Sequence, residues 1–84
     1  MSVRFETITA PEHWASYLIN GDRTSLSESE IEMVKRWLAR ECIARDDFVS
    51  CSDEPRFTWS YRLYCPEAEA NGGSVLDYTY AVRE

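Results

Sequence analysis

Hydrophobic and polar residues alternate in several stretches of the chain and repeat every three or four positions in two others. Residues 3–8 alternate, which predicts a short strand. Residues 56–64 alternate more strictly and are rich in aromatic side chains, and residues 75–82 alternate again. Residues 48–51 form a brief strand-like run. The pattern therefore predicts four strands, one before the two helical repeats and three after them.

Apolar side chains of the alternating stretches fall on one face of each predicted strand. They are Val3 and Phe5, then Phe57, Trp59, Tyr61 and Leu63, then Leu76, Tyr78, Tyr80 and Val82. A sheet that packs one face on a core has this pattern, so we expect these side chains to be at least half-buried. The opposite face would present polar groups such as Arg62, Asp77 and Thr79 to water or to a partner.

The first helical repeat covers residues 13–19. Thr9 and Glu12 have the spacing of a capping box, and Pro11 suits a first helical turn. Gly21 follows the repeat and can adopt the left-handed conformation that ends a helix. The residues expected on the buried face are Trp14, Tyr17 and Leu18.

The second helical repeat is longer and has the stronger start signal. Ser27 and Glu30 form another capping box in front of it. Its apolar stripe consists of Ile31, Val34, Trp37, Leu38 and Cys42. We expect this stripe to pack against the sheet.

These elements predict a single α+β domain over residues 1–84 with the order β-α-α-β-β-β. Two helices would cover one face of a small antiparallel sheet, and the last three strands would form a meander. Residues 52–55 have turn chemistry, and residues 66–74 read as a loop because they contain Asn71, Gly72 and Gly73.

Composition excludes several classes of function. The net charge of −6 lacks the surplus of Lys and Arg that direct nucleic-acid binding needs. No apolar run approaches the length that spans a bilayer, and the alternating N-terminus does not read as a signal peptide. Only three glycines are present, which argues against a phosphate-binding loop. We expect a cytoplasmic protein that binds neither membranes nor nucleic acid directly.

Candidate catalytic and metal-binding residues are few. Cys42, Cys51 and Cys65 lack the C-x-x-C spacing of a redox or zinc site, and a reducing compartment fits them. With His13 they could supply a Cys3His zinc site, although structural zinc ligands usually come in closely spaced pairs. His13 is the only histidine, and we interpret it as a surface residue rather than a catalytic base. The expectation is a protein without enzymatic activity, metal or cofactor.

The acidic residues are clustered, and they are the main candidates for partner binding. The set comprises Glu28, Glu30, Glu32, Asp46, Asp47, Asp53 and Glu54. Rigidly spaced carboxylates can imitate a nucleic-acid backbone and steer the protein toward a basic groove. The alternatives are that the charge merely maintains solubility, that the first-turn glutamates favour the helix dipole, or that adjacent acids bind a divalent cation.

Several segments resemble small acidic proteins carried by phages and plasmids of proteobacteria, most of which lack an assigned activity. The segments are residues 13–22 (HWASYLINGD), Ser25-Leu26, Trp37-Leu38, Asp53-Glu54-Pro55 and the tyrosine-rich final strand. In size, acidity and general character the chain is also similar to anti-CRISPR proteins, several of which occupy DNA-binding surfaces of CRISPR effector complexes. Those inhibitors share little sequence, so the resemblance assigns no residue a role.

The clustered acids and the scarcity of catalytic residues, together with this resemblance, favour a phage- or plasmid-borne, DNA-mimicking inhibitor. It would bind the basic, nucleic-acid-binding groove of a host CRISPR effector complex in the bacterial cytoplasm, with a type I effector as the leading candidate. We expect the protein to be a monomer. An inhibitor could instead bind through the exposed sheet face around Arg62 and Tyr64. The alternative class of function is a non-catalytic interaction module, such as a toxin antidote or a subunit of a larger assembly.

Overall fold

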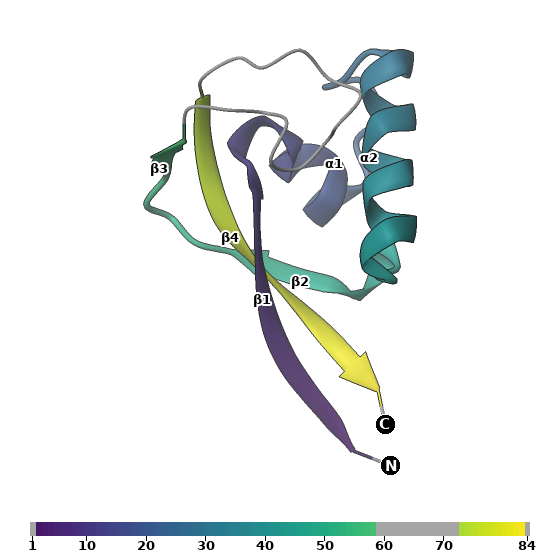
Figure 1. Ribbon diagram of the computed structural model, residues 1–84, viewed down its shortest axis with the longest axis vertical. Coiled ribbons are helices and arrows are strands. Elements are labelled where there is room, and N and C mark those ends of the chain that lie inside the picture. Colours follow the sequence, from purple (N-terminus) through teal and green to yellow (C-terminus); the bar gives the residue numbers. More distant parts are fainter. Residues whose placement is uncertain (1, 59–72, 84) are drawn as a thin grey trace.

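The computed structural model describes residues 2–58 and 73–83 and shows an α+β fold with the predicted order β-α-α-β-β-β (Figure 1). Two helices lie against one face of a four-stranded antiparallel sheet. The elements are β1 (Val3–Pro11), η1 (Glu12–Trp14), α1 (Ala15–Asn20), α2 (Glu28–Glu41), η2 (Arg45–Asp47), β2 (Phe48–Cys51), β3 (Arg56–Thr58) and β4 (Gly73–Arg83), where η denotes a short 3-10 helix. The predicted fold class is confirmed.

Strand β4 pairs with each of the other three strands. Strand β1 lies along one edge of β4 over its full length, from Val3 opposite Arg83 to Pro11 opposite Val75. Strands β2 and β3 share the other edge, where β2 pairs near Tyr80 and β3 pairs near Val75. All these pairings are antiparallel, so β4 is the central strand of the sheet.

The predicted meander of the last three strands is wrong. Strands β2 and β3 are both antiparallel to β4 and therefore run in the same direction, one after the other along one edge. The predicted turn at residues 52–55 interrupts this edge without reversing the chain. Ser52 keeps the chain on β4, because its N–H donates to the carbonyl oxygen of Asp77 at 3.0 Å.

The core lies between the helices and the inner face of the sheet. Trp14 of η1 and Trp37 of α2 are buried and meet edge to face, with ring centroids 5.2 Å apart. From the sheet, Phe48 packs against Tyr78 at 5.9 Å in a similar geometry. The predicted buried faces of both helices are confirmed for Trp14, Tyr17, Leu18, Ile31, Val34, Trp37 and Leu38.

Interactions close in sequence determine where helix α2 begins and ends. The Ser27 side chain accepts a hydrogen bond from the Glu30 N–H at 3.2 Å, so the predicted cap is confirmed. The helix ends at Glu41, and Cys42 follows in the left-handed conformation with φ 59°. Cys42 was expected to extend the buried stripe but is exposed, because the left-handed residue turns the chain away from the helix.

The predicted start of the first helix is wrong. Thr9 and Pro11 belong to β1, and no side chain caps η1 at Pro11. The Thr9 hydroxyl donates instead to Asp77 Oδ1 of β4 at 2.7 Å. Cross-strand pairing therefore replaces the expected capping role, and α1 begins later, at Ala15. Its predicted end is confirmed, because Gly21 takes the left-handed conformation with φ 71°.

Some predicted burial in the strands is also corrected. Val3, Phe5 and Phe57 are 50%, 61% and 78% exposed. Val3 and Phe5 pair with Arg83 and Ala81, so they lie on the outer face of the sheet and not on the inner face of Tyr78, where they were expected. Gly73 and Ser74, expected in a loop, begin β4. Residues 59–64 of the predicted third strand and residues 66–72 of the predicted loop lie outside the described residues. Within the described part of the chain, neither helix has the length and apolar character needed to cross a membrane.

Tyr78 places a polar hydroxyl group in this core. Its ring is fully buried, and its hydroxyl donates to the carbonyl oxygen of Pro11 at 2.7 Å. Burial raises the pKa of Tyr78 above its ordinary value of 10.0, and the neighbouring Cys51 and Glu12 raise it further. The phenol is therefore held in its neutral form, in which it can donate to Pro11.

We expect Tyr78→Phe to lower the free energy of unfolding by about 1–2 kcal/mol, because the buried Pro11 carbonyl loses its donor. A raised pKa in the folded state also means that the stability gained from the neutral phenol is present below pH 10 and is lost as the pH rises beyond it. Urea unfolding at neutral and alkaline pH measures both effects. The alkaline loss should be smaller in the Phe variant, and an equal loss in both proteins would contradict this role of Tyr78.

Candidate functional site

The seven predicted partner-binding acids lie at three separate places. Glu28, Glu30 and Glu32 are in the first turns of α2, Asp46 and Asp47 are in η2, and Asp53 and Glu54 are in the segment between β2 and β3. Helix α2 has 14 residues, so its two ends are about 20 Å apart at 1.5 Å per residue. Figure 1 shows η2 and the start of α2 at opposite ends of that helix. The structure therefore does not bring these acids into one patch.

Two side chains of η1 contact the carboxylate of Glu30. Its Oε1 atom lies 2.8 Å from His13 Nε2 and accepts a hydrogen bond from Trp14 Nε1 at 2.9 Å. Trp14 is buried, and its indole N–H needs an acceptor there. Glu30 satisfies it and so joins η1 to the start of α2. This role was not predicted from the sequence, although the need of a buried Trp for an acceptor was a usable signal.

The other two acids of α2 differ in their surroundings. Glu32 is exposed and lies 3.8 Å from the Lys35 ammonium group, a surface pair of small energetic value. Glu28 is exposed in the first turn, where a carboxylate interacts favourably with the helix dipole. No ion pair to Glu28 is found within residues 2–58 and 73–83.

Both acids of η2 are paired with arginines. Asp46 binds the neighbouring Arg45, and Asp47 lies 3.2 Å from the Arg83 guanidinium at the end of β4. Asp47 is the less exposed of the two acids, so its pair also fastens η2 to β4. These two charges are partly neutralised within the chain. They offer less to a basic partner than the sequence pattern indicates.

Asp53 and Glu54 project from the interruption between β2 and β3. Both side chains are exposed, and neither forms an ion pair with another residue that the structure describes. The charge of Asp53 also affects Cys51. Burial raises the pKa of the Cys51 thiol, and the Asp53 carboxylate raises this pKa further. Because Ser52 is tied to β4, these two carboxylates stand on an anchored segment.

A polar network on the outer sheet face was not predicted. Arg56 Nη2 donates to Asp77 Oδ1 at 2.5 Å and to the Thr9 hydroxyl at 3.2 Å. Since Thr9 also donates to the same carboxylate oxygen, the three side chains connect β1, β4 and β3. The sequence predicts only that Asp77 lies on a polar face. The distant partners could not be identified before the sheet order was known.

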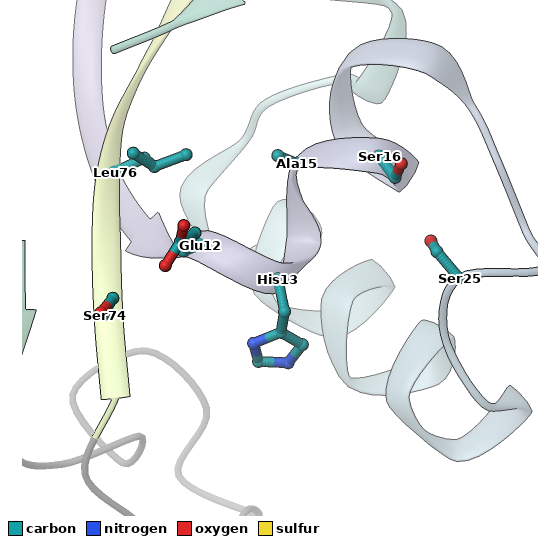
Figure 2. A pocket seen from close by; sticks show the side chains of 7 residues that line it. All are labelled: Glu12, His13, Ala15, Ser16, Ser25, Ser74 and Leu76. Carbon is teal, nitrogen blue, oxygen red and sulfur yellow. The ribbon is translucent and has the colours of Figure 1, made fainter. Parts of the chain in front are cut away.

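An open hollow of about 580 Å³ adjoins His13. Figure 2 shows the seven lining residues, which come from η1, α1, the loop before α2 and β4. The imidazole of His13 points away from the hydroxyl groups of Ser16 and Ser25 in this view. The Ser25 hydroxyl donates to the carbonyl oxygen of Asp22 at 3.1 Å. The imidazole of His13 is oriented by the Glu30 carboxylate, which lies 2.8 Å from its Nε2 atom. The two serines lie on other sides of the hollow.

The described cysteines are free thiols at separate sites. Cys42 is exposed and Cys51 is half-buried, while Cys65 lies outside the described residues. Across the described ranges, no three residues among His, Cys, Asp and Glu come close enough together to hold a metal ion. The predicted Cys3His alternative therefore finds no support from Cys42, Cys51 and His13.

Together these features define a small α+β domain with an acidic surface, part of which is paired within the chain. A comparison with protein families matches residues 7–82 to a domain of unknown function, DUF6926. This match spans almost the whole chain, and the protein belongs to that family. No curated protein and no solved structure matches the chain.

We expect Glu30→Ala to destabilise the fold by about 1–3 kcal/mol, because the buried Trp14 indole N–H loses its charged acceptor. Glu28→Ala is the matched control, since Glu28 is an exposed acid in the same helical turn. Urea unfolding gives the stability, and the indole N–H resonance of Trp14 reports the lost hydrogen bond. Equal stability of the two variants would contradict the structural role of Glu30.

We expect an alkylating reagent to modify Cys42 before Cys51 at neutral pH. Cys42 is exposed, whereas Cys51 is half-buried and its raised pKa leaves less of the reactive thiolate. Peptide mass spectrometry after short exposure to a maleimide separates the two sites. A Cys42→Ser variant should leave the rate at Cys51 unchanged, and faster labelling of Cys51 than of Cys42 would contradict the structure.

Proposed function

We propose that this protein is a non-catalytic acidic inhibitor that acts in the bacterial cytoplasm by covering a basic, nucleic-acid-binding groove of a partner complex. A type I CRISPR effector is the leading candidate for this partner. The observation that carries the proposal is the pair Asp53 and Glu54: two exposed carboxylates, with no ion pair among the described residues, on an anchored segment of a chain with net charge −6.

Electrostatics supports binding to such a groove. Exposed acids on a negatively charged body speed its encounter with a surface rich in Lys and Arg. Glu28 and Glu12 add exposed carboxylates on other elements of the chain. The paired acids Glu30, Asp46 and Asp47 have smaller parts in this proposal, because neighbours in the chain already hold their charges.

The test measures whether the purified protein competes with target DNA for a purified, guide-loaded type I effector. The native chain should displace labelled DNA in a gel-shift assay. The double variant Asp53→Lys/Glu54→Lys should need at least about tenfold more protein for the same displacement, because two attractive charges become repulsive. The displacement should also weaken when salt is raised, as expected for contacts between exposed charges.

Two further variants serve as controls. The exchange Glu32→Lys/Lys35→Glu keeps the net charge and the position of the pair on α2, so it should compete as the native chain does. Asp46→Lys/Asp47→Lys reverses acids that are already paired and should have the smaller effect of the two reversals. Displacement that is indifferent to Asp53 and Glu54, or a native chain that displaces no DNA, would reject the proposed function.

A further inference from the structure

The N-terminal half of β1 forms a sheet edge beyond the body of the molecule. Figure 1 shows this half of β1 and the C-terminal half of β4 running on past β2 and the helices as a two-stranded ribbon. In the described ranges β1 pairs with β4 and with no other strand. Every second residue of β1 therefore directs its backbone N–H and C=O groups away from β4. Such an edge can pair with another strand.

The same ribbon carries two exposed apolar side chains on its outer face. Val3 and Phe5 lie opposite Arg83 and Ala81 of β4, and they are half-exposed or more. A two-stranded ribbon is marginally stable by itself, and further strands with a shared apolar face stabilise it. The edge therefore offers both backbone pairing and apolar burial to one partner strand.

The sequence of this edge is complementary to itself. When two copies of β1 pair antiparallel about a two-fold axis at Phe5, each Arg4 stands opposite the Glu6 of the second copy. The two Phe5 side chains then face each other, and Val3 faces Thr7. Opposite charges and aromatic pairs across strands are stabilising. Within one chain Arg4 Nη2 already lies 2.6 Å from Glu6 Oε2, so pairing would create a network of four alternating charges.

Neighbouring registers lack this complementarity. A two-fold axis at Arg4 places the two arginines opposite each other, and an axis at Glu6 does the same with the two glutamates. Like charges directly opposite in a sheet are destabilising. We propose that the protein forms a symmetric homodimer through antiparallel pairing of the β1 edges about Phe5. This interface is independent of the proposed function, because it contains none of the acids argued there.

The dimer departs from the monomer expected from the sequence, and the mass in solution tests it. Light scattering coupled to size exclusion should give about twice the chain mass of 9.8 kDa for the native protein. Arg4→Glu and Glu6→Arg should each weaken dimerisation roughly tenfold or more, because both cross-strand pairs become repulsive. The exchanged variant Arg4→Glu/Glu6→Arg should dimerise like the native chain.

Mixing the single variants gives the sharpest result. Arg4→Glu presents two acids and Glu6→Arg presents two bases, so an equimolar mixture should form a heterodimer that neither variant forms alone. Thermal unfolding monitored by circular dichroism confirms that each variant is folded. A native chain that remains monomeric at the highest attainable concentration overturns the proposal, and so does a dimer that Arg4→Glu leaves intact.

Cross-linking tests the register itself. In a background with Cys42, Cys51 and Cys65 replaced by Ser, mild oxidation should link Phe5→Cys into a covalent dimer, because that position faces its own copy. Val3→Cys should link much more slowly, because it faces Thr7 of the second copy. Faster linking at position 3 than at position 5 overturns the register about Phe5.

Discussion

The pairing of β4 with every other strand is the constraint on which the rest of the structure depends. Strand β1 occupies one edge of β4 and the collinear strands β2 and β3 occupy the other, so β4 supplies the inner face on which both helices pack. Tyr78 fills the centre of that face and ties it to the end of β1. Asp77, the preceding residue, ties the outer face together through Thr9 and Arg56. Both faces of the fold thus depend on adjacent residues of one strand.

The acidic residues serve two different purposes in this fold. Glu30 satisfies a buried indole and joins η1 to α2, and Asp47 fastens η2 to the end of β4. Asp53 and Glu54 have no such task among the described residues and remain exposed. Carboxylates that are equivalent in a charge count therefore differ in how much their removal would destabilise the fold. Fewer exposed carboxylates are therefore available to a basic partner than the charge count indicates.

Local patterns predicted the fold class, the helical faces and the cap at Ser27, because each depends on residues a few positions apart. The sheet order could not be predicted this way. A turn sequence at residues 52–55 ordinarily reverses the chain, but here Ser52 binds β4 and the chain continues in the same direction. The candidate site was predicted only as exposed acids. Their partners, such as Arg83 for Asp47, are distant in sequence and become visible only in three dimensions.

Because β4 follows every element that it organises, the sheet cannot assemble until β4 itself has been synthesised. The helices can form early, but the buried faces of Trp14 and Trp37 have no sheet to cover them until β4 has been synthesised. Pairing Val3 with Arg83 then closes almost the whole chain into one loop, and such non-local contacts slow folding. During this interval the nascent chain exposes apolar surface that a chaperone could bind.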